Sequence, residues 1–168
     1  MNQGSGKTIK IALAAAAVIV AAAVLFLVPW YRGYMQQINF RTCMRARRKV
    51  CIDVREMKKA WGEEQAASES GEGAEELPGT EERNAALPDK DIQIEFLLRA
   101  VKNLPTDVSE PVLEAEEDDT LRFTCTGLCK AGGVTTFFLD PETGDLYGDC
   151  SLEEHLQNVN AETSYNNW

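Results

Sequence analysis

The sequence has one histidine, His155, and it lies in a polar segment near the C-terminus. Nucleophilic catalysis by a Ser-His-Asp or Cys-His arrangement needs a histidine held beside the nucleophile, and this one has no such setting. Asp and Glu are abundant but stand mostly in solvated runs, so no isolated general acid or base can be assigned. We therefore predict that the protein is not an enzyme and has no catalytic residues and no cofactor.

Basic residues are scarce in the C-terminal part of the chain. Residues 61–168 hold six Lys and Arg against 25 Asp and Glu, whereas residues 1–60 hold eleven against two. An acidic surface without a basic patch repels phosphate, which excludes nucleic acid as a partner of this part. The basic cluster at residues 41–49 is interpreted as a solvated helix face, with contact to anionic lipid headgroups as the alternative.

Charge is absent from residues 11–28, which are eighteen consecutive apolar residues, eight of them alanine. As a helix this segment is about 27 Å long at ~1.5 Å per residue, close to the roughly 30 Å hydrocarbon core of a bilayer. We predict a single-pass transmembrane helix that follows a short cytoplasmic N-terminus, residues 1–10.

Two other interpretations of this segment are a cleaved secretory signal and a buried core helix. Lys7 and Lys10 form a basic region, and the run Ala21 to Ala23 resembles a small-residue cleavage site. That cut would leave the apolar residues 24–28 as a new N-terminus, which would be prone to aggregate. A core helix needs only about 10–14 residues, so the membrane anchor is favoured.

No proline follows Pro29 before Trp61, which predicts a helical stalk over residues 29–61. One face of this helix carries apolar residues at spacings near 3.5, as an amphipathic helix does. We interpret this face as a packing surface for the C-terminal domain or for the stalk of a neighbouring copy. Its residues are Phe40, Cys43, Val50, Val54, Met57 and Trp61, with Arg47 interrupting the series.

The rest of the chain divides into a linker, a small domain and a tail. Residues 62–91 are rich in Gly, Ser, Ala, Pro and Glu without large apolar residues, which predicts a disordered acidic linker. Residues 92–155 are predicted to form a small α+β domain that begins with a helix ended by Pro105. Residues 156–168 form a polar tail.

Four short β-prone runs follow that helix, and they predict a small antiparallel sheet. Pro141 presets the backbone of a turn and Gly144 accepts a left-handed conformation there, so the last two runs should form a hairpin. The four runs are residues 112–115, 121–125, 134–139 and 146–150.

Several segments carry a resemblance when they are taken in order. They are the apolar N-terminal helix, the stalk with Cys43-Met-Arg-Ala-Arg-Arg48, residues 127–136, residues 140–144, and Cys150-Ser-Leu-Glu-Glu-His155. This order resembles type IV pilin-like and pseudopilin-like proteins of Gram-positive bacteria, in which two cysteine-containing elements close a small sheet on the helix. The resemblance implies a structural subunit of a pilus or secretion-type assembly. Its partners would be the membrane and other pilin-like subunits, copies of itself included, or assembly-machinery proteins.

The chain departs from that family near its N-terminus. The family's processing site is a Gly followed by an aromatic residue or Met, with Glu at the fifth mature position. Here Lys7 follows Gly6, and Ile11 stands where the Glu would be. Pro29 lies near the position where pilin helices carry a kink-forming proline, whose physical effect is the loss of one backbone hydrogen bond.

Five cysteines in 168 residues are typical of a small exported domain that disulfides hold together. Cys43 and Cys51 are eight positions apart on the stalk, which is about 12 Å in a straight helix and beyond the ~7 Å limit between bridged Cα atoms. They cannot pair with each other, and an odd total leaves one thiol over. We predict a disulfide between Cys129 and Cys150, and a second from Cys125 to Cys43 or Cys51, so that disulfides close the sheet.

Charge and cysteine usage predict opposite sides of the membrane. Cytoplasmic flanks are normally rich in Lys and Arg, which would put residues 30 onward inside the cell, whereas disulfides need an oxidising compartment. We expect a C-terminal domain outside the cell membrane, with no bound metal. The alternative is a membrane-tethered binding or adaptor module in which a Cys₃His set binds zinc, and that set would be Cys125, Cys129, Cys150 and His155.

Overall fold

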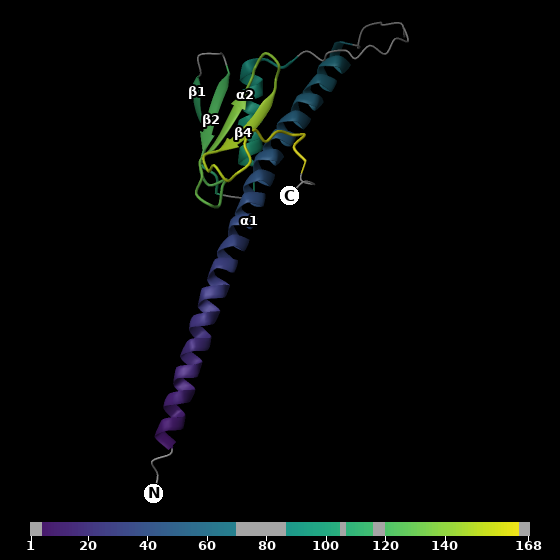
Figure 1. The fold of residues 1–168 in the computed structure, drawn as a ribbon. Helices are drawn as coiled ribbons and strands as arrows, with labels where there is room; N and C mark the ends of the chain where they lie inside the picture. Colours follow the sequence, from purple (N-terminus) through teal and green to yellow (C-terminus); the bar gives the residue numbers. More distant parts are fainter. Residues whose placement is uncertain (1–4, 70–86, 105–106, 116–119, 165–168) are drawn as a thin grey trace. The chain divides into compact units, whose positions relative to one another are not determined.

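The computed structural model describes residues 5–69, 87–104, 107–115 and 120–164. Within these ranges the chain is α+β, as predicted: it has a long apolar N-terminal helix, a short helix and a four-stranded antiparallel sheet (Figure 1). Most of the predicted linker, residues 70–86, and both ends of the chain lie outside the described residues. The chain divides into two compact units, Met1–Ile38 and Asn39–Trp168, and each is described by itself.

The first unit is formed by the N-terminal part of helix α1, whose bounds are Ser5–Glu69. This helix holds a window with a mean hydropathy of 2.5 that is long and apolar enough to cross a membrane, and none of that window is buried. A core helix of a soluble protein would bury most of such a window, whereas this window is exposed. The exposed apolar side chains include Leu13, Val18, Ile19, Val20, Val24, Leu25, Phe26 and Leu27.

The second unit, which we call the head, contains the rest of α1, helix α2 (Lys90–Lys102) and the sheet. The strands follow one another across the sheet in chain order, and each neighbouring pair is antiparallel. They are β1 (Val112–Ala115), β2 (Leu121–Cys125), β3 (Thr135–Leu139) and β4 (Leu146–Cys150).

Helix α1 ends later than the sequence analysis expects, at Glu69 instead of Trp61. All residues from 63 to 69 except Ser68 are Glu, Gln or Ala, which are strong helix formers. Lys59 and Glu63 also form an i,i+4 ion pair at 3.9 Å, an arrangement that supports an exposed helix. A single glycine therefore does not end the helix.

The turn between β3 and β4 confirms the predicted hairpin. Asp140 accepts backbone hydrogen bonds from Glu142 (2.8 Å) and Thr143 (3.2 Å) through its Oδ1 atom. Gly144 has a φ of 74°, a left-handed conformation that an L side chain rarely adopts, and its N–H donates to the Asp140 carbonyl at 2.7 Å. Local turn chemistry thus sets the register that pairs Phe137 with Gly148.

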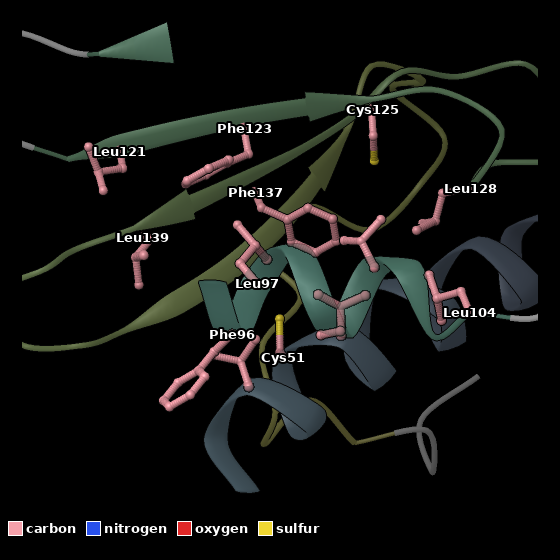
Figure 2. Packing of buried hydrophobic residues seen from close by; sticks show 14 residues of the cluster. Cys51, Phe96, Leu97, Leu104, Leu121, Phe123, Cys125, Leu128, Phe137 and Leu139 are labelled. Atoms are coloured by element: carbon pink, nitrogen blue, oxygen red, sulfur yellow. The ribbon is translucent and has the colours of Figure 1, made fainter. Parts of the chain in front are cut away.

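The core of the head lies where the inward side chains of the sheet meet the two helices (Figure 2). Inward residues alternate along β2 and β3, so Phe123 pairs with Phe137 across the strands. Figure 2 shows Leu97 of α2 beneath Phe137. Helix α1 contributes Val50, Cys51 and Val54 to the same core, with Met57 and Trp61 partly buried against it. The apolar face predicted on the stalk therefore packs on this chain's own head.

Candidate metal centre

Four side chains of types that bind metals, from separate elements of the chain, meet inside the head. Cys43 comes from α1, Cys129 from the loop after β2, Cys150 from the last position of β4, and His155 from the segment that follows. All four are buried, and their potential ligand atoms lie within 4.8 Å of one another. We call this set the Cys₃His cluster.

The loop that carries Cys129 is shaped by glycine. Gly132 has a φ of 88°, and its N–H donates to the Cys129 carbonyl at 3.0 Å, which closes a tight turn. The next residue, Gly133, lies against the sulfurs: a Cβ there would be 2.7 Å from Cys150 Sγ and 3.3 Å from Cys129 Sγ. The missing side chain of Gly133 is what lets the two sulfurs approach this part of the backbone.

The segment from Cys150 to His155 is held by one side chain, Gln157. Its Nε2 atom donates to the carbonyls of Cys150 (2.9 Å), His155 (3.1 Å) and Leu152 (3.3 Å), and its Oε1 atom accepts from the Cys150 N–H (3.2 Å). The His155 N–H also donates to the Leu152 carbonyl at 3.0 Å. The amide of Gln157 therefore fixes the distance between two members of the cluster.

The imidazole of His155 is oriented toward the sulfurs. Its Nδ1 atom lies 3.5 Å from Cys129 Sγ and 3.4 Å from Cys150 Sγ. The ring of Phe40 approaches the imidazole edge-on, with centroids 5.8 Å apart and an angle of 73° between the rings. Phe40, predicted as a helix-packing residue, thus positions a potential ligand.

Burial controls the ionisation of the cluster. It raises the pKa of Cys43, an effect that the charge of Arg47 opposes and the neighbouring thiols of Cys150 and Cys129 reinforce. Burial likewise raises the pKa of Cys150, and it lowers the pKa of His155, where the charge of Arg47 acts in the same direction. Burial therefore favours the uncharged forms of Cys43, Cys150 and His155.

Arg47 is a fully buried cation beside this cluster. Its Nη1 atom donates to the Gly148 carbonyl at 3.0 Å, but its Nε and Nη2 atoms have no hydrogen-bond partner among the described residues. Glycine at position 148 leaves room chiefly for the ring of Phe137, since a Cβ there would lie 2.9 Å from Phe137 Cε1. A guanidinium so placed carries a positive charge that the described protein groups leave uncompensated.

The structure brings together three of the four residues in the alternative zinc set that the sequence suggested. That set included Cys125, whereas the structure brings Cys43 to Cys129, Cys150 and His155. Cys125 instead points into the apolar core from β2, where burial raises its pKa to about 11. Its inward direction follows from the period-2 alternation along β2, which puts Cys125 on the same face as Phe123 and Leu121.

The predicted disulfides have no support in the structure, because all five cysteines are free thiols. Cys129 and Cys150, the first predicted pair, are neighbours in the Cys₃His cluster. Cys51 and Cys125 belong instead to the apolar core, where the thiol of Cys51 donates to the Val159 carbonyl at 3.5 Å. The contact of Cys43 is with the Cys129–Cys150 pair and not with Cys125.

Sequence reasoning treated Cys43 as a disulfide or packing residue and not as a metal ligand, and it assigned no site role to Arg47, Gly133 or Gln157. One signal was available, because Arg47 interrupts the apolar face of the stalk one turn after Cys43, and a charge at a buried position needs a partner. The spacing alone gives no sign of what that partner is.

Comparison of the chain with protein-family models, with curated proteins and with solved structures finds no match. Any function proposed for this chain therefore rests on its residues and on the geometry described above.

Proposed function

We propose that the protein is a membrane-anchored, pilin-like structural subunit of a pilus or secretion-type assembly. The observation that carries the proposal is the packing of the stalk: the apolar face that includes Val50 and Val54 is buried in the chain's own head. In a tethered adaptor, the anchor and the domain would be joined by a flexible segment. Here one helix, α1, supplies both the apolar anchor and part of the head's core.

The aromatic residues after the apolar run support the anchor. Trp30 and Tyr34 stack with centroids 5.9 Å apart, and Tyr31 lies between them in sequence; all three are exposed. Amphipathic aromatic rings are enriched at the boundary between lipid tails and headgroups. They follow Val28, the last residue of the apolar run, at the position where an interfacial belt is expected.

The proposed role has consequences for partners and for location. The apolar surface from Leu13 to Val28 has no partner among the described residues of this chain, so in an assembly it would contact lipid and the same segment of neighbouring subunits. The head would then lie outside the cytoplasmic membrane, as the resemblance to pilin-like proteins implies.

This proposal is tested by crosslinking within the membrane. A photoreactive amino acid at Phe26, which is 78% exposed, should give a ladder of multimers in membranes from cells that make the full-length protein. The same probe at Lys102, an exposed position at the end of α2, controls for random collision. Monomers alone at both positions, or adducts that contain only lipid, would contradict a structural subunit.

A second candidate is a membrane-tethered binding or adaptor module whose head faces the cytoplasm. Two observations favour it: the basic residues that follow the anchor and the five buried cysteines, which form no disulfide. It differs from the first candidate in the side of the membrane and in the absence of self-assembly.

A further inference from the structure

We propose that the reduced head binds one zinc ion through the Sγ atoms of Cys43, Cys129 and Cys150 and the Nδ1 atom of His155. This inference goes beyond the proposed assembly role and does not depend on it. It is carried by the distances between the four side chains, by the charge beside them and by the two residues that shape the pocket.

The distances agree with a tetrahedral site. Zinc binds thiolate sulfur at about 2.3 Å and imidazole nitrogen at about 2.0–2.1 Å, so a tetrahedral ion separates sulfur from nitrogen by roughly 3.6 Å. The Nδ1 atom of His155 lies 3.5 Å from Cys129 Sγ and 3.4 Å from Cys150 Sγ. All four ligand atoms lie within 4.8 Å of one another, so a shared ion would need only a small inward shift of any pair that is farther apart than the roughly 3.8 Å sulfur–sulfur separation of a tetrahedral site.

Hydrogen bonding among the thiols explains this arrangement less well. A neutral imidazole nitrogen has one lone pair in the ring plane, so Nδ1 of His155 can accept one S–H hydrogen bond, not two of equal length. Two sulfurs at 3.4 and 3.5 Å from the same nitrogen match the roughly 3.6 Å sulfur–nitrogen separation expected around a shared tetrahedral ion.

The charge of the site also balances when zinc is present. Three thiolates, a neutral imidazole and Zn²⁺ together carry one negative charge. Arg47 lies fully buried beside the cluster with one positive charge and with two nitrogen atoms that have no hydrogen-bond partner among the described residues. A buried cation of this kind is costly unless it is paired, and the zinc complex supplies the missing negative charge.

Two residues next to the Cys₃His cluster, Gly133 and Gln157, hold its members in positions that suit a bound ion. Gly133 leaves space beside two of the sulfurs, and Gln157 holds the segment between Cys150 and His155 by four hydrogen bonds. Such outer contacts orient the ligands of metal sites. Because all four positions are filled by protein side chains, the site has no open position for a substrate and belongs to the structural class.

The test uses full-length protein purified in detergent with a thiol reductant. We expect one zinc ion per chain by elemental analysis, and Co²⁺ in its place should give the intense visible absorption of a tetrahedral site and a sulfur-to-cobalt charge-transfer band. Cys43→Ser should abolish stoichiometric binding. Cys125→Ser and Cys51→Ser serve as matched controls, since both remove buried cysteines outside the cluster and should retain one zinc.

A conservative replacement keeps the test valid if Cys43→Ser does not fold. His155→Cys should still bind one ion, with a cobalt spectrum shifted toward that of four sulfur ligands. Absence of bound zinc in the reduced, folded protein would overturn the proposal, as would loss of zinc in Cys125→Ser with retention in Cys43→Ser. Neither outcome bears on membrane crosslinking at Phe26, so failure of the zinc site and failure of the assembly role can be told apart.

Discussion

At the scale of single residues, the unusual feature is Arg47, a charged side chain on the apolar face of α1. It is 0% exposed, yet only one of its nitrogen atoms, Nη1, has a hydrogen-bond partner among the described residues. A purely structural role would be better served by an apolar side chain of similar volume, because replacing a buried charge in this way is often neutral or stabilising. Its presence is explained if the neighbouring cluster becomes negatively charged.

Arg47→Met is therefore expected to maintain or raise the stability of the metal-free head and to weaken its binding of zinc. In metal-free, reduced protein the change should leave the midpoint of denaturant unfolding unchanged or raise it, because a costly buried charge is removed. Zinc affinity, measured by competition with a chromophoric chelator, should fall about tenfold, as for other residues just outside a metal's ligand shell.

Arg55→Met is the matched control for this change, because Arg55 is an exposed arginine on the same helix. It should alter neither quantity. Unchanged zinc affinity in Arg47→Met would show that the guanidinium does not compensate the charge of a metal complex.

At the scale of secondary-structure elements, local sequence patterns were sufficient to predict the strands but not to predict the Cys₃His cluster. The alternation of Leu121, Phe123 and Cys125 and the turn around Gly144 act over a few residues, and the strand bounds expected for β2 and β4 match those of the structure. The position of Cys43 is different in kind. It depends on how a helix packs on a sheet whose first strand begins only at Val112, which no short-range pattern encodes.

The burial of one face of α1 in the core of the head predicts how a substitution at Val54 changes the stability of the head. Val54 is 1% exposed in the core, so Val54→Ala should lower the free energy of unfolding of the head by about 2 kcal/mol through lost burial and a residual cavity. Val18→Ala makes the same chemical change on the same helix at a site that is 69% exposed in the other unit. Denaturant unfolding followed by near-ultraviolet circular dichroism measures both, and equal effects of the two changes would contradict the assignment of this face to the head.

At the scale of the whole molecule, the distribution of charge and the chemistry of sulfur bear on the side of the membrane where the head lies. More Lys and Arg follow the apolar run than precede it, where only Lys7 and Lys10 stand, and this difference favours a cytoplasmic head. An exported head would be expected to oxidise its thiols. Zinc binding would remove the expectation that the thiols of an exported head become oxidised. Disulfide exchange needs a free, accessible thiolate, whereas coordination engages the thiolates of the cluster and burial keeps oxidants away, so a zinc-loaded head can be exported with its thiols intact.

Sidedness can be measured because every native cysteine is buried, so a new exposed cysteine reacts against a low background. Glu142 lies exposed in the β3–β4 turn, and Glu142→Cys should be labelled by a membrane-impermeant maleimide added to intact cells if the head is extracytoplasmic. Ser5→Cys, on the other side of the apolar run, should be labelled only after the cells are permeabilised. The reverse pattern would place the head in the cytoplasm, where a pilus-type subunit has no function, and would leave the tethered zinc-binding module as the interpretation that the charge, the thiols and the Cys₃His cluster support together.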